Sequence, residues 1–153
     1  MAKTLNKKIV LLADVKNQDL AKKINDHIKK HKKFNIVFCK PDPNFINAIC
    51  DNYKNHVYKN KNSRMIILDD YGALPFMVAS KIPTSIVAEL EDEHSAHMTM
   101  GHNNANVITL GSKILGFDLL IGIIDKYLFA KYEGGRHKVR LDMLTKMLEK
   151  EKI

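Results

Sequence analysis

The sequence is short of cysteine, of long apolar runs and of linker-like stretches, and each shortage excludes a class of protein. Its two cysteines, Cys39 and Cys50, are too few for a disulfide framework and lack metal-site spacing, so we expect free thiols. No apolar run approaches the roughly 18 to 20 residues that span a bilayer. No apolar signal core precedes the first strand-like run, which favours a cytoplasmic protein over a secreted one.

The chain also has no internal repeats, and its 153 residues suit one compact domain. We therefore expect residues 1–153 to form a single domain. With 45% apolar and 27% charged residues, the composition is that of an ordinary globular protein and disfavours disorder.

Positive charge is concentrated in the first part of the chain. The net charge is +8, and residues 1–64 hold 15 Lys and Arg against 5 Asp and Glu, whereas residues 65–153 hold 10 against 12. Much of the excess is lysine near the end of an expected helix, as at Lys29 and Lys30, where cations complement the helix dipole. A solvated lysine-rich face explains the bias better than a nucleic-acid site, because charge bias alone is weak evidence for nucleic acid.

Short apolar runs alternate with helical patterns along the chain. Strands are expected at 9–13, 34–38, 65–68, 85–88 and 107–110. Helices are expected at about 20–28, 45–57, 76–79, 92–100 and 119–129. The alternation predicts an α/β domain, a three-layer sandwich whose five-stranded parallel sheet has helices on both faces.

Two glycine-marked boundaries complete this pattern. Gly101 is expected to cap the helix at 92–100. A last amphipathic helix follows Gly134-Gly135 and lies beyond the last strand, which makes it a candidate to pack on a neighbouring subunit.

Ligands of parallel sheets bind outside the carboxyl ends of the strands. Here those positions are 14–15, 69–72, 89–92 and 111–113. The pattern is not that of a phospho-receiver domain, which needs an acidic pair after the first strand and a lysine after the fifth. Asp14 is followed by Val15, and Lys81 falls between the third and fourth strands.

Histidines and an amide gather around residue 100. His94 and His97 share a helix face with His102 just beyond, but no acidic partner stands at metal-motif spacing, so we expect no metal there. His102 can move a proton near neutral pH, and the adjacent Asn103 can hydrogen-bond a hydroxyl or an enediolate oxygen. An Asn-rich turn leading into a strand explains the same residues without any chemistry.

Two arginines stand where the last helix begins. Arg136 and Arg140 are four residues apart and so share one face of that helix. Two guanidinium groups near a helix N-terminus form a good receptor for a phosphate dianion. A Gly-Gly linker before a basic, solvated helix is the alternative.

Three segments resemble one family of enzymes. They are D-D-Y-G-A-L-P-F-M-V-A-S-K-I at 69–82, G-H-N-N-A-N-V-I-T-L-G at 101–111 and Y-E-G-G-R-H-K-V-R-L-D-M-L at 132–144. Together they are similar to the family of ribose-5-phosphate isomerase B and galactose-6-phosphate isomerase, and most similar to its A-subunit type. The resemblance is strong from about Met65 onward and weaker over residues 1–64.

The resemblance implies a Rossmann-like fold and isomerisation of a phosphorylated sugar between aldose and ketose, without metal or cofactor. Proton transfer between C1 and C2 passes through a cis-enediolate, in active sites shared between neighbouring subunits. By resemblance, His102 would open the sugar ring and Asn103 would hold the enediolate. The phosphate would be held by Arg136, Arg140, His137 and Lys113.

The chain also departs from isomerase B. Val15 stands where that branch has the histidine of an Asp-His pair, and Asp69 stands where it has a cysteine base. Tyr71 replaces the threonine of its Gly-rich anion loop, and Leu74-Pro75 replaces the donor-rich end of that loop. Asp69 is the candidate for a substitute base if burial raises its pKa above the ordinary value of about 3.9.

These departures predict a chain that carries one half of a shared site. By resemblance, the B chain of a galactose-6-phosphate isomerase is the complement, since it keeps the Asp-His pair and the Gly-rich loop but lacks the Gly-Gly-Arg-His segment. We therefore expect an A-type subunit that interconverts galactose 6-phosphate and tagatose 6-phosphate together with a B-type subunit. The alternatives are a divergent ribose-5-phosphate isomerase B acting as a homo-oligomer, such as a homodimer, and a non-catalytic partner-binding subunit.

Overall fold

Five apolar segments form the parallel sheet that was predicted. The computed structural model describes residues 7–150 and arranges the strands in the order β2-β1-β3-β5-β4, every neighbouring pair being parallel. The strands are β1 (Lys7–Ala13), β2 (Phe34–Phe38), β3 (Ser63–Asp69), β4 (Val87–Glu89) and β5 (Val107–Gly111). The central strands β3 and β5 are buried along their whole length, which is why residues 65–68 and 107–110 are almost all apolar.

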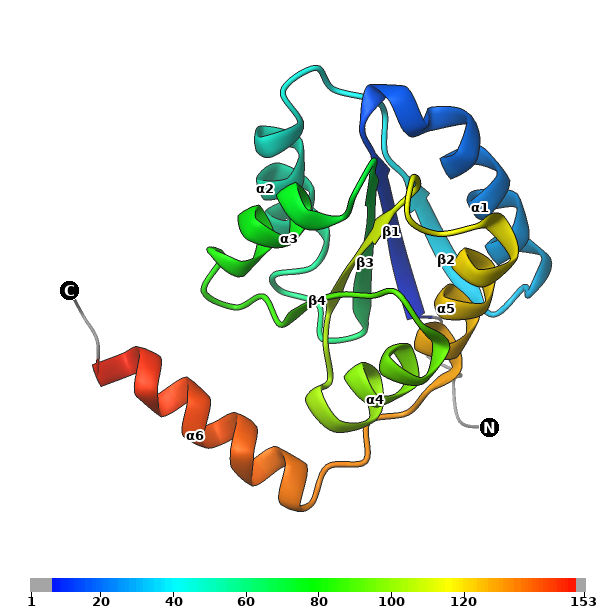
Figure 1. The fold of residues 1–153 in the computed structure, drawn as a ribbon. Coiled ribbons are helices and arrows are strands. Elements are labelled where there is room, and N and C mark those ends of the chain that lie inside the picture. Colours follow the sequence, from blue (N-terminus) through cyan, green and yellow to red (C-terminus); the bar gives the residue numbers. More distant parts are fainter. Residues whose placement is uncertain (1–6, 151–153) are drawn as a thin grey trace.

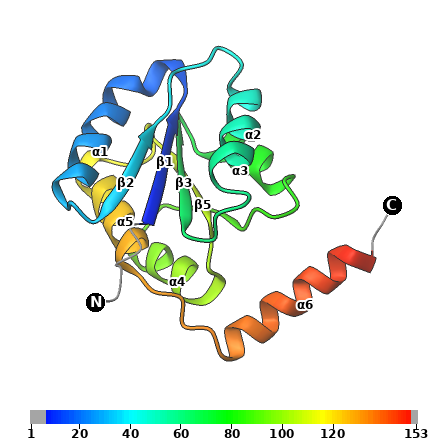
Figure 2. The same cartoon turned by 180° about the vertical axis from the view of Figure 1, so that it is seen from behind.

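Helices cover both faces of the sheet (Figures 1 and 2). On one face, α1 (Gln18–Lys30), α4 (Glu93–Asn103) and α5 (Phe117–Phe129) pack on strand residues such as Ile9 and Leu11. On the other, α2 (Phe45–His56) and α3 (Ala73–Ser80) pack on the alternate residues Val10 and Leu12. A short 3-10 turn, η1 (Val15–Asn17), joins β1 to α1. The predicted three-layer α/β architecture is confirmed.

Helix α4 ends later than its glycine suggests. The predicted C-cap at Gly101 is wrong, because α4 continues through Asn103 and is capped by Asn104. Asn104 adopts the left-handed conformation with φ 51°, and its N–H bonds to the carbonyls of Met100 and Thr99. Asparagine tolerates this conformation, so it ends the helix in place of glycine. His102 and Asn103 therefore lie on the last turn of a helix and not in a loop.

Smaller differences concern the fourth strand and the neighbouring helices. β4 begins at Val87 rather than at residue 85, and α3 and α5 each start earlier than expected. The lysines at the end of α1 are exposed, as a solvated basic face requires.

The cysteines are free, as predicted: Cys39 is buried and Cys50 is exposed. Burial raises the pKa of the Cys39 thiol to about 11, which makes it a poor nucleophile. Among residues 7–150, no helix combines the length and apolar character that a membrane crossing requires.

The last helix, α6 (Arg136–Lys150), extends away from the body of the molecule (Figures 1 and 2). Its side chains Val139, Met143, Leu144 and Met147 are 57–62% exposed. The predicted amphipathic helix is thus present, and its apolar side chains are uncovered in the single chain. That this face packs on another subunit stays a prediction.

A close backbone contact at the end of β5 gives the fold a sharp test. A methyl group on Gly111 would lie 2.7 Å from the carbonyl carbon of Tyr71, whereas one on Gly116 would meet nothing within 4 Å. We expect Gly111→Ala to lower the free energy of unfolding by about 1–3 kcal/mol, because backbone must move to admit the methyl group. The matched Gly116→Ala variant should change it by less than about 1 kcal/mol. Urea unfolding measures both, and equal stabilities would contradict the close contact.

Candidate active site

Two histidine rings stack at the junction of α4 and α6. The ring centroids of His102 and His137 are 3.9 Å apart and their planes are inclined by 11°. Between the two helices, Glu133 places its Oε2 atom 3.8 Å from Nε2 of His102 and 3.7 Å from Nε2 of His137. The arrangement joins the last turn of α4 to the first turn of α6.

Backbone and side-chain hydrogen bonds hold the end of α4 in place. Nη2 of Arg64, on β3, donates to Oδ1 of the capping Asn104 at 3.0 Å. The buried hydroxyl of Tyr127, on α5, donates to the carbonyl of Ala105 at 2.8 Å. The N–H of Glu133 donates to the carbonyl of Gly101 at 2.9 Å. Sequence analysis missed these supporting residues, because their partners lie far away in the chain and belong to no motif.

The environment of His137 favours its neutral form. The residue is 8% exposed, and burial is the main cause that lowers the pKa of its imidazole. The neighbouring His102 and Arg136 lower it further, while the carboxylate of Glu133 opposes them. A neutral imidazole retains one N–H donor and one acceptor, so it can donate a hydrogen bond to an anionic ligand.

Arg136 and Arg140 occupy the first two turns of α6. Both are exposed and four residues apart, so their guanidinium groups share a face beside the histidine stack. Gly134 and Gly135 precede them with φ angles of 65° and 54°, a left-handed conformation that glycine adopts without strain. The start of a 15-residue helix adds the positive end of its dipole. This group can bind a phosphate.

A second group of polar residues lies at the carboxyl ends of β1, β3 and β5. Nδ2 of Asn17 donates to Oδ1 of Asp14 at 2.7 Å and to Oδ1 of Asp70 at 3.1 Å. Nζ of Lys113 forms an ion pair with Oδ2 of Asp70 at 2.9 Å. The carboxylate of Asp69 points back at its own loop, where Oδ1 accepts the N–H groups of Tyr71, at 3.1 Å, and Gly72.

Acidic groups dominate the electrostatics of this edge. Burial raises the pKa of Asp69, and the nearby carboxylates of Asp14 and Asp70 add to the effect, although its backbone hydrogen bonds oppose it. The pKa of Glu89, at the end of β4, is raised by partial burial and by Glu91 and Asp69. By contrast, the hydrogen bond from Lys113 lowers the pKa of Asp70. An incoming phosphate would meet several carboxylates here.

The two groups lie at opposite edges of the sheet. Arg64, near the amino end of β3, contacts the end of α4, whereas Asp69 closes β3 five residues later. At about 3.3 Å per residue, the two edges are roughly 16 Å apart. Figure 1 shows the same separation, with α4 and the start of α6 at one end of the strands and η1 and the start of α3 at the other. A hydrogen bond reaches about 3 Å, so one chain cannot bring both groups to one substrate carbon.

The structure therefore divides the predicted site residues into two sets. One set contains His102, Asn103, Arg136, His137 and Arg140, and the other contains Asp69 and Lys113. His94 and His97 are exposed on α4 and, within residues 7–150, belong to no group of potential metal ligands. His102, Glu133 and His137 do form such a group, as do His27, His31 and Asp125.

The histidine stack yields a direct titration test. We expect the pKa of His137 to lie below the usual 6.5, and Glu133→Gln to lower it further, because the carboxylate of Glu133 favours the protonated ring. A two-dimensional NMR titration of the imidazole signals between pH 4.5 and 8.5 measures both shifts. A pKa of His137 above 7, or an upward shift in Glu133→Gln, would contradict the buried environment described above.

Comparisons with known proteins agree with this architecture. Over 91 residues, the chain is 53% identical to the galactose-6-phosphate isomerase subunit LacA of Streptococcus mutans, a stretch that covers 60% of this chain and 64% of that protein. The chain thus spans about two thirds of that relative in the match. With LacA of Streptococcus pneumoniae it shares 38% identity over 139 residues, covering 91% of this chain and 98% of that protein.

A solved structure extends the comparison to three dimensions. Ribose-5-phosphate isomerase B from Mycoplasma genitalium, with bound ribulose-5-phosphate, matches with a TM-score of 0.78 and 31% identity, covering 94% of this chain and 97% of that one. The family model described as Ribose/Galactose Isomerase matches residues 9–144 and so includes both edges of the sheet. The chain belongs to the ribose/galactose isomerase family.

Proposed function

We propose that this chain is the A-type subunit of a galactose-6-phosphate isomerase and supplies the phosphate-binding and ring-opening half of a shared active site. The observation that carries the proposal is the separation of the two groups by the length of β3. His102, Arg136 and Arg140 make one edge suitable for an anionic sugar, while carboxylates make the other edge unsuitable. The names of the relatives from two streptococci support the substrate, and the bound ribulose-5-phosphate of the Mycoplasma enzyme supports a phosphosugar.

The reaction moves one proton from C2 to C1 and a second from O2 to O1, so that C1 is reduced and C2 is oxidised without an external redox partner. A base removes the C2 proton of open-chain galactose 6-phosphate, and the electron pair forms a cis-enediolate with C1. Protonation at C1 and at O1, with loss of the O2 proton, then gives the C2 ketone of tagatose 6-phosphate. Ring opening precedes this step, and it needs a proton donor at the ring oxygen and an acceptor at the C1 hydroxyl.

This chain supplies the groups that surround those atoms. His102 exchanges the proton that opens the ring, and the Asn103 side chain donates to the enediolate oxygen, where negative charge develops. Arg136 and Arg140 hold the phosphate, with His137 beside them as a neutral hydrogen-bond donor. The base for the C2 proton comes from the carboxyl edge of a B-type subunit.

The last helix explains how a companion would complete the site. Arg136, Arg140, Met143 and Met147 follow one another at intervals of four, three and four residues, so they share one face of α6. A subunit that covers the exposed apolar side chains of this face therefore lies next to the arginines. Its strand ends can then approach a sugar held by Arg136 and Arg140.

The proposal predicts activity in the mixed assembly only. We expect the chain alone to lack isomerase activity on galactose 6-phosphate and ribose 5-phosphate, and to gain it on galactose 6-phosphate when co-expressed with a B-type chain. In the assembly, His102→Ala or Arg136→Ala should reduce kcat/KM at least about 100-fold. A coupled assay of ketose formation measures this.

One control variant and two contradicting outcomes make the experiment decisive. His94→Ala removes an exposed histidine from the same helix and should leave kcat/KM within about twofold, with the same assembly size by gel filtration. Full activity of the chain alone on ribose 5-phosphate would instead establish the homo-oligomeric isomerase. Full activity of the His102→Ala assembly would remove His102 from the mechanism.

A variant of Asp69 distinguishes the half-site proposal from the alternative in which Asp69 is a substitute base. Asparagine keeps the oxygen that accepts the N–H groups of Tyr71 and Gly72, so Asp69→Asn should leave the activity of the mixed assembly within about twofold. Because burial raises the pKa of Asp69, ionisation destabilises the fold, and the variant should have a higher urea midpoint at pH 7. This gain should vanish as the pH falls through the unfolded pKa of about 3.9, where the native side chain is also neutral. Loss of activity by more than about 100-fold with a normal fold would identify Asp69 as the base.

A further inference from the structure

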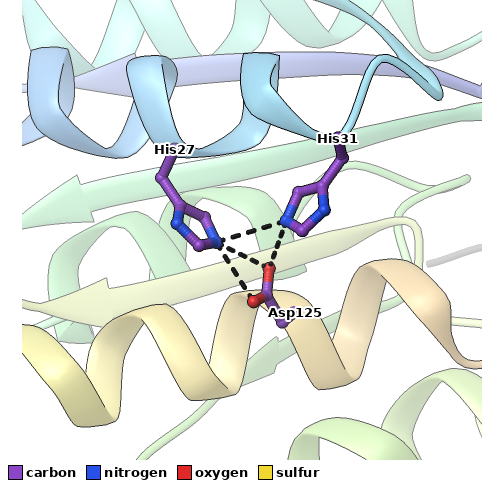
Figure 3. A group of neighbouring side chains, drawn as sticks. All are labelled: His27, His31 and Asp125. Carbon is purple, nitrogen blue, oxygen red and sulfur yellow. Dashed lines mark hydrogen bonds and ion pairs between the residues drawn. The ribbon is translucent and has the colours of Figure 1, made fainter.

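Two histidines and an aspartate converge between α1 and α5. His27 and His31 are four residues apart on α1 and face Asp125 on α5 (Figure 3). Nε2 of His27 lies 2.9 Å from Oδ1 of Asp125, and Nε2 of His31 lies 3.2 Å from the same oxygen. The two Nε2 atoms are 3.3 Å apart. Three potential ligand atoms thus form a nearly equilateral triangle.

Hydrogen bonds alone explain two sides of this triangle but not the third. If each imidazole donates its Nε2–H to Asp125, neither Nε2 has a lone pair for the other, and the short N···N approach gains no attraction. If either ring gives up that proton, it loses its bond to the carboxylate. A cation above the triangle would accept a lone pair from all three atoms at once.

The triangle has the dimensions of a zinc site. Ligands about 2.0–2.1 Å from a tetrahedral Zn²⁺ are roughly 3.3 Å from one another, close to the three separations here. Histidines at i and i+4 on one helix face are a proven pair of zinc ligands. Two imidazoles and one carboxylate favour Zn²⁺ over Mg²⁺ or Ca²⁺, which prefer oxygen ligands.

The surroundings fix the ligands yet leave a path for an ion. The ring of His31 packs edge-on against Phe129, at 4.9 Å between centroids, and also against Phe34. The side chains of the three ligands are 25–33% exposed, so water and a hydrated ion can reach them although most of each side chain is covered. Asp125 also lines a surface hollow of about 320 Å³, together with His97, Lys126, Phe129 and Ala130.

We propose that His27, His31 and Asp125 bind one Zn²⁺ ion, with water as the fourth ligand. The ion joins α1 to α5, and none of its three protein ligands belongs to the candidate active site. The charge of Asp125 offsets the cation, while Lys33, whose Nζ lies 5.5 Å from the ring centroid of Phe129, opposes it. The sequence hides this site, because Asp125 stands 94 residues after His31.

Calorimetry on the tag-free, full-length chain tests the site. The protein is stripped with EDTA, dialysed into chelator-free buffer at pH 7.5 and titrated with zinc chloride. We expect tight binding of one equivalent and a rise of several degrees in Tm at saturating zinc. In NMR spectra, zinc should shift the imidazole signals of His27 and His31.

Matched variants show which residues bind the ion. Asp125→Asn and His27→Gln should each weaken zinc binding at least tenfold and remove the rise in Tm. His94→Gln removes one exposed imidazole from α4, at a position that does not line the hollow beside Asp125, and should bind like the native chain. Metal-free urea midpoints confirm that each variant folds.

The second histidine group supplies the outcome that would overturn the proposal. His102, Glu133 and His137 also present three converging ligand atoms. If His102→Gln abolishes the tight binding of one zinc equivalent while Asp125→Asn retains it, zinc binds to the group that contains His102. The assignment of the site to α1 and α5 is then wrong. An absence of tight binding by the native chain would equally refute it.

Discussion

The parallel direction of the five strands determines where the functional groups of this chain lie. Every strand must be followed by a connection that returns to the same starting edge, so residues after strands gather at one edge and helix ends gather at the other. Asp14 and Lys113 follow strands and Asp69 ends one, whereas His102 and Asn103 end a returning helix. Such residues cannot exchange edges without reversing a strand. The division of the site is therefore a property of the topology.

The two edges differ in charge as well as in position. At the carboxyl edge, Asp70 forms an ion pair with Lys113, and Asp69 accepts hydrogen bonds from the N–H groups of its own loop. Those hydrogen bonds already occupy the amides that a Gly-rich loop would offer to an anion. At the amino edge, Arg136 and Arg140 are exposed and point from a helix N-terminus. The polar groups at the carboxyl edge thus bind to one another, whereas the arginines at the amino edge are open to a ligand.

Sequence patterns predicted most of the sheet because burial dictates its composition. The buried middle of β1 and of β3 is a continuous apolar run, so the positions of both strands were correct to within a few residues. The end of α4 was misplaced, because glycine is the commoner cap and the left-handed Asn104 depends on a tertiary bond from Arg64. Local patterns do not report bonds of this kind.

For the candidate site, too, the sequence predicted the residues that stand in contiguous motifs but not those that depend on tertiary contacts. His102, Arg136 and Arg140 stand in contiguous motifs, and the structure brings them to one edge. Glu133 carries no signal of its own in the sequence, although it faces both stacked rings. The separation of Asp69 from His102 is written in no single motif, since it arises from the parallel topology and the direction in which α4 runs across the sheet.

The glycine pair before α6 has a mechanical consequence. Gly134 and Gly135 act as a pivot, because neither has an atom within 4 Å of its would-be Cβ position and both adopt angles that cost glycine little. A 15-residue helix is about 22 Å long, so a rotation of about 10° at the pivot moves its far end by about 4 Å. Arg136, one residue beyond the pivot, hardly moves. The helix is thus a lever whose long arm can adapt to a neighbour's shape while its short arm keeps the guanidinium groups beside the stacked histidines.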